Sequence, residues 1–474
     1  MEDPNVKISY ETLWKFIIRP PKDDYTESML GSRYFKYKGK KYQRKDYDIM
    51  STQGYMMKAS FIEPLQESRP SIEMPVVLYL HGNSSSRIEG MNMAGELLKR
   101  DINLFVIDFV GCGLSEGEYI SLGYHESDDV GNVIDFIEKL PGVGKIGLWG
   151  RSMGAATTMI YAHRDNRVKA ICLDSPFADF NRLARELTLK QIKLPNFLIN
   201  GALSIIRGTI LKKNGLDIDK LKPIDLAGKT FQPAIFIHAI YDELINVQHS
   251  LDLFNKYGGQ QKSLKCCDKG GHNTKRNSMI TNEIGEFFKK YLSNEYNEEN
   301  DNNNDYLSFG AYTNYTENSN NISNYNTGEA KKTSLRKRKA SNNSINQKQM
   351  RKNTIEEDED PFNDNSIERI EYFNKKEQTD RRQINEIEYL LKSIREPDLK
   401  AFGNKNNNNN IKLDNNNYQK NKNNNNNINN NFYNDFKNNN NNNNRNFNNL
   451  KINDSNINFN NWVKGTRINS NNNY

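Results

Sequence analysis

The sequence has few cysteines and no large excess of charge of either sign. Only four of its 474 residues are cysteine, and two of them, Cys266 and Cys267, are adjacent. That spacing does not resemble a disulfide framework and favours a reducing compartment. The 66 basic and 59 acidic residues leave a net charge of +7, which is too modest to predict a nucleic-acid partner. We therefore expect neither a disulfide-rich secreted domain nor a nucleic-acid-binding protein.

The sequence also lacks a long hydrophobic run. The apolar patch at residues 13–18 is far shorter than the ~20 residues that a membrane span needs. We expect this patch to form a helix that packs on the folded domain, with a membrane-surface anchor as the alternative. The start of the chain is mostly polar, and no secretory or lipidation signal is recognisable. A cytoplasmic location is expected, with a nuclear or membrane-peripheral location as the alternatives.

Composition divides the chain near residue 293. Apolar runs recur up to that point and then stop, and Asn accounts for 38 of the residues from 401 to 474. Such a segment buries too little apolar surface to offset the conformational entropy that the chain loses on folding. Residues 294–474 are therefore predicted to be a disordered, low-complexity, Asn-rich tail. Near-helical apolar spacing predicts a short helix at 367–396, either transient or formed on a protein partner. A basic run at 331–352 is either a solvated segment or a nuclear-localisation signal.

Within residues 41–293 the pattern predicts a mostly parallel central sheet flanked by helices. Two β-like runs, 44–50 and 55–61, come first. The later strands are expected at residues 75–80, 104–109, 145–149, 169–173, 233–239 and 263–267. They read as continuous apolar runs separated by helical stretches, which is typical of strands that are buried on both faces. An insert at 178–230 is expected to be a helical lid, and residues 1–40 an extension that packs on the domain.

The strongest chemical signal is the pentapeptide Gly150-Arg151-Ser152-Met153-Gly154. It directly follows an apolar strand and directly precedes helix-forming residues. A serine on such a sharp turn is held in a strained backbone conformation with its hydroxyl above the sheet, and the flanking glycines are needed because side chains there would collide with neighbouring elements. The motif therefore predicts a nucleophile elbow with Ser152 as the nucleophile.

A serine nucleophile needs a base to accept its proton and an acid to orient that base. His272 lies in a glycine-containing loop after the last strand, from which an imidazole can reach the serine. Asp242 follows the preceding strand, which gives the chain order Ser, Asp, His. Asp242 is the predicted acid, while the adjacent Glu243 and Asp174 after an earlier strand remain alternatives.

Attack on a carbonyl group creates an oxyanion, which needs hydrogen-bond donors already aimed at it. The backbone N–H of Met153, at a helix amino terminus, is one predicted donor. The second is expected from the loop His81-Gly82-Asn83, which follows the third strand, with Asn83 as the donor.

Five segments of residues 10–293 together resemble α/β hydrolases of the serine-aminopeptidase-like group, which also contains acyl-protein thioesterases and monoacylglycerol-lipase relatives. The matching segments are residues 81–83, 108–117, 147–154, 173–177 and 271–273. The resemblance implies an α/β-hydrolase fold with a helical lid. It also implies that Ser152, Asp242 and His272 form a catalytic triad, that Asn83 and Met153 form the oxyanion hole, and that no cofactor or metal is used.

The predicted function is that of a serine hydrolase acting through an acyl-enzyme. It would cleave carboxylic ester, thioester or amide bonds in a small-molecule or acylated substrate. The alternative is a hydrolase-fold scaffold that recruits protein partners through its tail, but the sequence retains all three triad residues, which favours the enzyme. The substrate is not predicted, because the shape of the pocket depends on how the insert at 178–230 folds.

Overall fold

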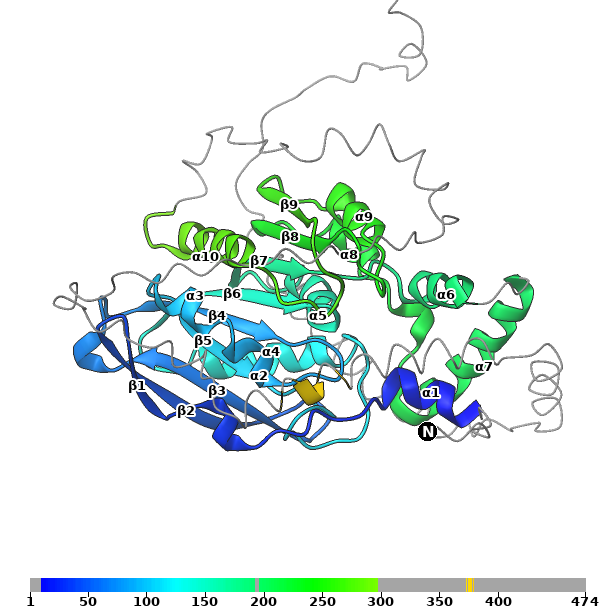
Figure 1. Ribbon diagram of the computed structural model, residues 1–474, viewed down its shortest axis with the longest axis horizontal. Helices are drawn as coiled ribbons and strands as arrows, with labels where there is room; N and C mark the ends of the chain where they lie inside the picture. The colour runs from blue at the N-terminus through cyan, green and yellow to red at the C-terminus, as the bar shows by residue number, and fades with distance from the viewer. Residues whose placement is uncertain (1–9, 192–195, 297–371, 373, 377, 379–474) are drawn as a thin grey trace, which may run out of the picture. The chain divides into compact units, whose positions relative to one another are not determined.

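The computed structural model describes most of the first 296 residues and a few residues of a later segment (Figure 1). The described residues are 10–191, 196–296, 372, 374–376 and 378. The basic run, the Asn-rich stretches and most of the predicted helix at 367–396 therefore lie outside the described residues. Those residues of that predicted helix that are described are helical.

The described residues form a mixed, mostly parallel sheet of nine strands in the order β1-β2-β3-β5-β4-β6-β7-β8-β9. Pairing is antiparallel between β1 and β2, between β2 and β3, and between β3 and β5. All the remaining neighbours in this order, starting with β5 and β4 and ending with β8 and β9, pair parallel. The strands are β1 (Tyr34–Tyr37), β2 (Lys40–Met50), β3 (Met56–Pro64), β4 (Met74–Leu80), β5 (Asn103–Ile107), β6 (Val143–Arg151), β7 (Val168–Asp174), β8 (Ala234–Ala239) and β9 (Lys262–Cys267).

The sheet begins earlier than the sequence predicts. β1 lies inside the stretch 1–40, which the sequence predicts to be an extension that packs on the domain, and it forms a hairpin with β2 and so belongs to the sheet itself. Lys38 and Gly39 make the turn with positive φ angles of 48° and 78°. The pattern does not predict this strand, because two of its four residues, Tyr34 and Lys36, are exposed at the edge of the sheet and the strand is not a continuous apolar run.

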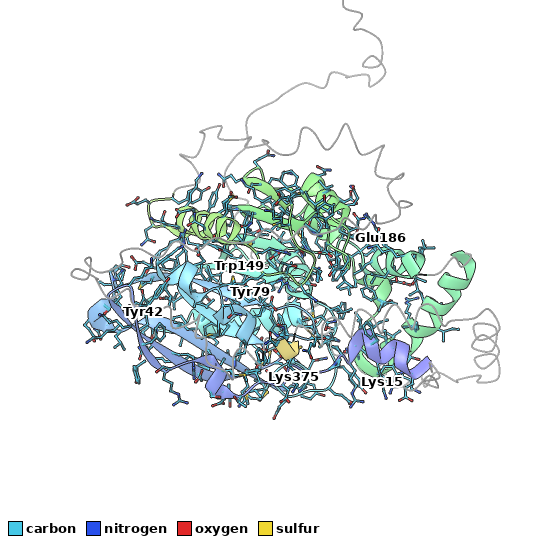
Figure 2. All side chains as sticks on the ribbon, viewed as in Figure 1. Lys15, Tyr42, Tyr79, Trp149, Glu186 and Lys375 are labelled. Atoms are coloured by element: carbon cyan, nitrogen blue, oxygen red, sulfur yellow. The ribbon has the colours of Figure 1, made fainter. Side chains whose placement is uncertain are left out.

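Helices cover both faces of the sheet, and the side chains of β4 show this directly. Val76 and Leu78 belong to one buried apolar cluster with α4, α5 and α9, while Val77 and Tyr79 belong to another with α3 and α10. On the second face Tyr79 packs against Trp149 of β6, with ring centroids 5.5 Å apart (Figure 2). These helices are α3 (Ala94–Leu98), α4 (Glu126–Ile137), α5 (Met153–Ala162), α9 (Gln248–Lys256) and α10 (Ser278–Leu292).

The insert after β7 contains two longer helices, α6 (Phe180–Gln191) and α7 (Asn196–Asn214), followed by the short α8 (Ile224–Ala227). The amino-terminal α1 (Tyr10–Ile18) packs against α7 (Figure 1). Trp14 of α1 is buried, and the Nζ atom of Lys213 lies 4.4 Å from its ring centroid. Among the described helices, none has the length and apolar character needed to cross a bilayer.

Candidate active site

Ser152 stands at the sharp turn between β6 and α5, at the carboxyl edge of the parallel strands. Its φ angle is 52° and its ψ angle is −114°, a conformation that L-residues adopt rarely. A Cβ atom on Gly150 would lie 2.2 Å from the carbonyl oxygen of Gly154, and one on Gly154 would lie 1.9 Å from the carbonyl oxygen of Leu80. Only glycine therefore fits on either side of this turn.

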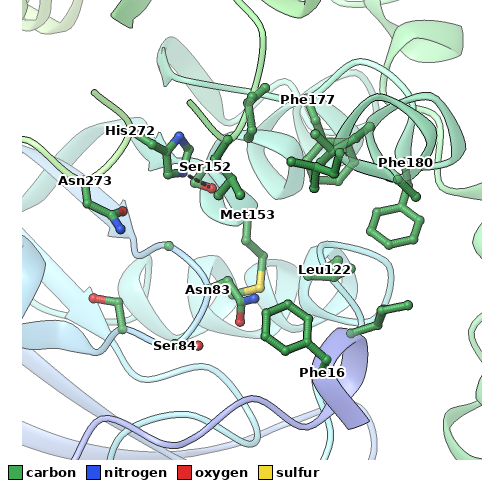
Figure 3. A pocket seen from close by; sticks show the side chains of 18 of the residues that line it. Phe16, Asn83, Ser84, Leu122, Ser152, Met153, Phe177, Phe180, His272 and Asn273 are labelled. Atoms are coloured by element: carbon green, nitrogen blue, oxygen red, sulfur yellow. Dashed lines mark hydrogen bonds between the residues drawn. The ribbon is translucent and has the colours of Figure 1, made fainter. Parts of the chain in front are cut away.

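His272 connects Ser152 to Asp242 through its two ring nitrogens. Its Nε2 atom lies 3.0 Å from the Oγ atom of Ser152, a contact drawn in Figure 3, and its Nδ1 atom lies 2.7 Å from Oδ2 of Asp242. Both His272 and Asp242 are buried. The three side chains come from loops after β6, β8 and β9, which end at the same edge of the sheet. This arrangement can move a proton from the serine hydroxyl to the imidazole.

The two alternative acids are occupied elsewhere. Asp174 forms a buried ion pair with Arg276, whose Nη2 lies 2.8 Å from its Oδ1. Glu243 accepts a hydrogen bond of 3.0 Å from the backbone N–H of His272, so it holds the loop and does not contact the ring. Of the three acids, Asp242 is the one that faces the imidazole.

Asp242 is surrounded by donors that stabilise its ionised form. Its Oδ1 atom accepts the backbone N–H groups of Leu244 and Ile245 at 2.9 and 2.7 Å, and His238 lies beside its Oδ2. Burial acts to raise the pKa of Asp242, but the charge of His272 and the hydrogen bonds from both histidines lower it below the ordinary value. The carboxylate therefore stays ionised and can hold one tautomer of His272.

The backbone groups predicted to form the oxyanion hole line the same cavity as Ser152. Met153 is the first residue of α5, and Asn83 follows β4. The neighbouring Gly82 N–H donates to Glu89 Oε2 at 3.2 Å. Within the described residues the N–H groups of Asn83 and Met153 donate to no other group, so both can serve a ligand.

Arg151 and Glu89 link the two loops on either side of Ser152. The Nη1 atom of Arg151 lies 3.1 Å from Oε1 of Glu89, and its Nη2 donates to the carbonyl oxygen of His272 at 2.8 Å. Burial acts to raise the pKa of Glu89, but Arg151, with smaller contributions from Ser85, His81 and Lys376, lowers the pKa to about 2. Sequence reasoning missed this pair. Glu89 belongs to a five-residue helix, α2 (Arg87–Met91), and no motif marks it.

A cavity of about 260 Å³ extends from Ser152 in two directions. In Figure 3, Phe16, Leu122 and Phe180 lie on one side of the serine, and Ser84 and Asn273 lie on the other. The apolar lining comes from α1, α6, α7 and nearby loops: Phe16, Ile17, Leu122, Phe177, Phe180, Leu183, Ala184, Leu187, Leu203, Ile206, Leu244 and Ile245. The polar lining residues are Ser84, Ser85, Glu89, Arg151, Asn273 and Lys376, and the Nζ atom of Lys376 lies 3.3 Å from the carbonyl oxygen of Ser84. We call these two parts the apolar arm and the polar arm.

Other nucleophile or metal chemistry has little support in the described part of the chain. No cluster of three or more His, Cys, Asp or Glu side chains there is arranged to hold a metal ion. The four cysteines are unpaired by disulfides, and burial raises the pKa of the Cys112 and Cys172 thiols. Burial thus disfavours the thiolate form of these two cysteines, whereas the Ser152 hydroxyl lies against an imidazole.

Comparison with known proteins places the central part of the chain among hydrolase-fold sequences. Residues 75–195 match the family described as alpha/beta hydrolase fold. The chain is 26% identical over 227 residues to the uncharacterized protein YqkD of Bacillus subtilis, a match that covers 47% of this chain and 71% of that relative. It is 32% identical over 119 residues to lysophosphatidylserine lipase ABHD12 of Gallus gallus, covering 23% of this chain and 30% of the relative.

A solved structure is also similar to this chain. The Pyrococcus furiosus esterase Pf2001 aligns with a TM-score of 0.45 and 20% identity, covering 58% of this chain and 98% of that structure. The strand order and the family match over residues 75–195 confirm the fold predicted from the sequence: the described chain has the α/β-hydrolase fold, a mostly parallel sheet flanked by helices.

Proposed function

We propose that this protein is a serine hydrolase that cleaves carboxylic esters or thioesters, with Ser152, His272 and Asp242 as its catalytic triad. The observation that carries the proposal is the unbroken series of contacts from Ser152 Oγ through His272 to Asp242, inside a cavity with an apolar arm. A non-catalytic scaffold has no need for a strained serine beside an imidazole that is held by a buried carboxylate.

In the proposed reaction His272 Nε2 accepts the Ser152 hydroxyl proton as Oγ attacks the carbonyl carbon. The N–H groups of Asn83 and Met153 stabilise the resulting oxyanion. The carbon–oxygen or carbon–sulfur bond then breaks, and the leaving alkoxide or thiolate takes the proton from His272. Water, activated by the same imidazole, attacks the acyl-serine ester and releases the acid, which regenerates the free hydroxyl.

The apolar arm favours an acyl chain as the bound part of the substrate, because apolar surface gains free energy when it leaves water. The similarity to lysophosphatidylserine lipase ABHD12 of Gallus gallus also supports ester cleavage. A serine aminopeptidase would need a carboxylate to hold the substrate's ammonium group. Among the described cavity residues Glu89 is the carboxylate available, and Arg151 already pairs with it. Ester or thioester cleavage is therefore preferred over amide cleavage.

The test is covalent labelling of the full-length chain with a fluorophosphonate probe. Ser152→Ala should abolish labelling, because no other serine in the described residues lies beside the His272 ring. Ser71→Ala, which changes an exposed serine on the surface, should label like the wild type. Equal labelling of the Ser152→Ala variant, or none of the folded wild type, would contradict the proposal and favour the scaffold.

A further inference from the structure

Residues from late in the chain complete one end of the cavity. Tyr372 is 6% exposed, and its hydroxyl donates to Oδ2 of Asp23 at 2.5 Å. The Nζ atom of Lys376 lies 3.0 Å from the same oxygen and 3.3 Å from the carbonyl oxygen of Ser84. Ser84 follows Asn83, so the docked segment, by which we mean residues 372 and 374–376 (in the short yellow ribbon of Figure 1), lies against the loop that is proposed to hold the oxyanion.

Asp23 is fully engaged in holding this segment in place. Besides Tyr372 and Lys376 it accepts the hydroxyl of Ser86 at 2.6 Å. The Ser86 side chain in turn caps the amino terminus of α2 by accepting the N–H of Ile88. A buried carboxylate with three donors is well satisfied, and Asp23 does not itself line the cavity.

Charges that do line the cavity are out of balance. They are Glu89, Arg151 and Lys376, which is two cations for one carboxylate. Arg151 is paired with Glu89 inside the polar arm, whereas Asp23, the partner of Lys376, lies outside it. A lysine ammonium has three N–H donors, and within the described residues Lys376 has two acceptors, so one donor remains for a ligand.

The position of Lys376 in the polar arm indicates which end of a bound substrate it would contact. With an acyl chain in the apolar arm and its carbonyl at Ser152, the leaving group extends into the polar arm, where Lys376 lies beside Ser84. We propose that Lys376, carried by the docked segment, is a specificity-determining residue that selects substrates with a negatively charged leaving group. This inference rests on the proposed hydrolase function and adds the class of leaving group to it.

The test uses two thioesters of the same chain length, S-octanoyl 3-mercaptopropionate and S-octanoyl 3-mercaptopropanol, whose leaving thiols end in an anionic carboxylate and in a neutral hydroxyl group. Hydrolysis of either consumes one water and releases octanoate and a thiol, which a thiol reagent measures. In the full-length wild type kcat/KM should be about tenfold higher for the anionic thioester, the size expected for one hydrogen bond to a charged group. The Lys376→Gln variant should lose this preference, so that it hydrolyses the two thioesters with similar kcat/KM.

Two further variants separate charge from packing. Lys376→Arg keeps the cation and should keep the preference for the anionic thioester. Lys375→Gln changes an exposed neighbouring cation that does not line the cavity, and it should behave like the wild type. An unchanged preference in Lys376→Gln, or an equal loss on both thioesters, would overturn the inference while hydrolysis of the neutral thioester still supported the proposed function. A folded wild type that hydrolyses neither thioester would overturn both.

Discussion

The two walls of the cavity are built on different principles. The catalytic wall consists of Ser152, Asp242 and His272 on short loops at one edge of the sheet, where backbone hydrogen bonds and close glycine contacts leave little freedom. The covering wall consists of α1, α6, α7 and the docked segment, which come from distant parts of the chain and contribute mainly apolar side chains. The first wall is suited to fixed chemistry and the second to selecting the substrate, so substitutions in the two should have different effects.

Removing the acid of the catalytic wall should have the largest effect. Asp242→Asn should lower kcat/KM by about 10⁴-fold, because an amide favours the wrong tautomer of His272. Glu243→Gln should change it by less than about tenfold, since the Glu243 carboxylate accepts the backbone N–H of His272 and an amide oxygen can do the same. Steady-state kinetics on an octanoyl ester measures both. A comparable loss in Glu243→Gln would show that the acid had been assigned wrongly.

Adding a methyl group at Gly154 of the nucleophile elbow should destabilise the fold strongly. Gly154→Ala should lower the free energy of unfolding by about 3 kcal/mol or more, since the new Cβ would lie 1.9 Å from Leu80 O. Gly208→Ala in α7 is the matched change in the covering wall, where a Cβ has open space around it. It should raise stability by about 0.5–1 kcal/mol. Urea denaturation measures both, and equal effects would remove the contrast between the walls.

Lowering the pH should remove the stabilisation that the ion pair between Glu89 and Arg151 gives the fold. The pKa of Glu89 falls from its ordinary value of 4.5 to about 2 in the folded chain. The ionised Glu89 carboxylate therefore contributes fully to the free energy of unfolding above about pH 4.5, and this contribution is lost as pH falls through about 2. Between those values the wild type should lose about 3 kcal/mol more unfolding free energy than Glu89→Gln. Urea titrations across this pH range test the difference. The exposed Glu73→Gln should follow the wild type, and identical curves for Glu89→Gln would rule out this contribution.

The smallest effect is expected from reshaping the covering wall. Leu183→Trp fills part of the apolar arm and should lower kcat/KM for dodecanoyl esters about tenfold relative to butanoyl esters. Leu189 is on the same helix but 49% exposed, so Leu189→Trp should leave the chain-length profile unchanged. If both variants shift the profile alike, the apolar arm is not where the acyl chain binds.

Much of the catalytic wall could be predicted because its constraints are local. The elbow needs glycine on both sides of Ser152 for steric reasons, so it can be recognised from the five consecutive residues 150–154. Strands that are buried on both faces also have a continuous apolar pattern, so the parallel part of the sheet was predicted correctly. The roles of Ser152, Asp242 and His272 stay predictions, although the structure brings all three within hydrogen-bonding distance.

The covering wall could not be predicted because its constraints are long-range. Lys376 is separated from the elbow by more than two hundred residues, and nothing in its local sequence indicates a contact with Asp23. Glu89 acquires its role only when β4 and β6 bring the loops after them together. The choice among Asp242, Glu243 and Asp174 also depended on loop geometry, which a pattern of residue types does not contain.

The contact between Tyr372 and Asp23 joins residues 349 positions apart, and this makes the cavity dependent on an intact chain. While the chain is whole, the docked segment reaches Asp23 as a tethered ligand, at an effective concentration set by the connection between them. A single cut between residues 297 and 371 would turn it into a separate peptide, which would have to bind from dilute solution. The charge balance of the polar arm would then depend on protein concentration.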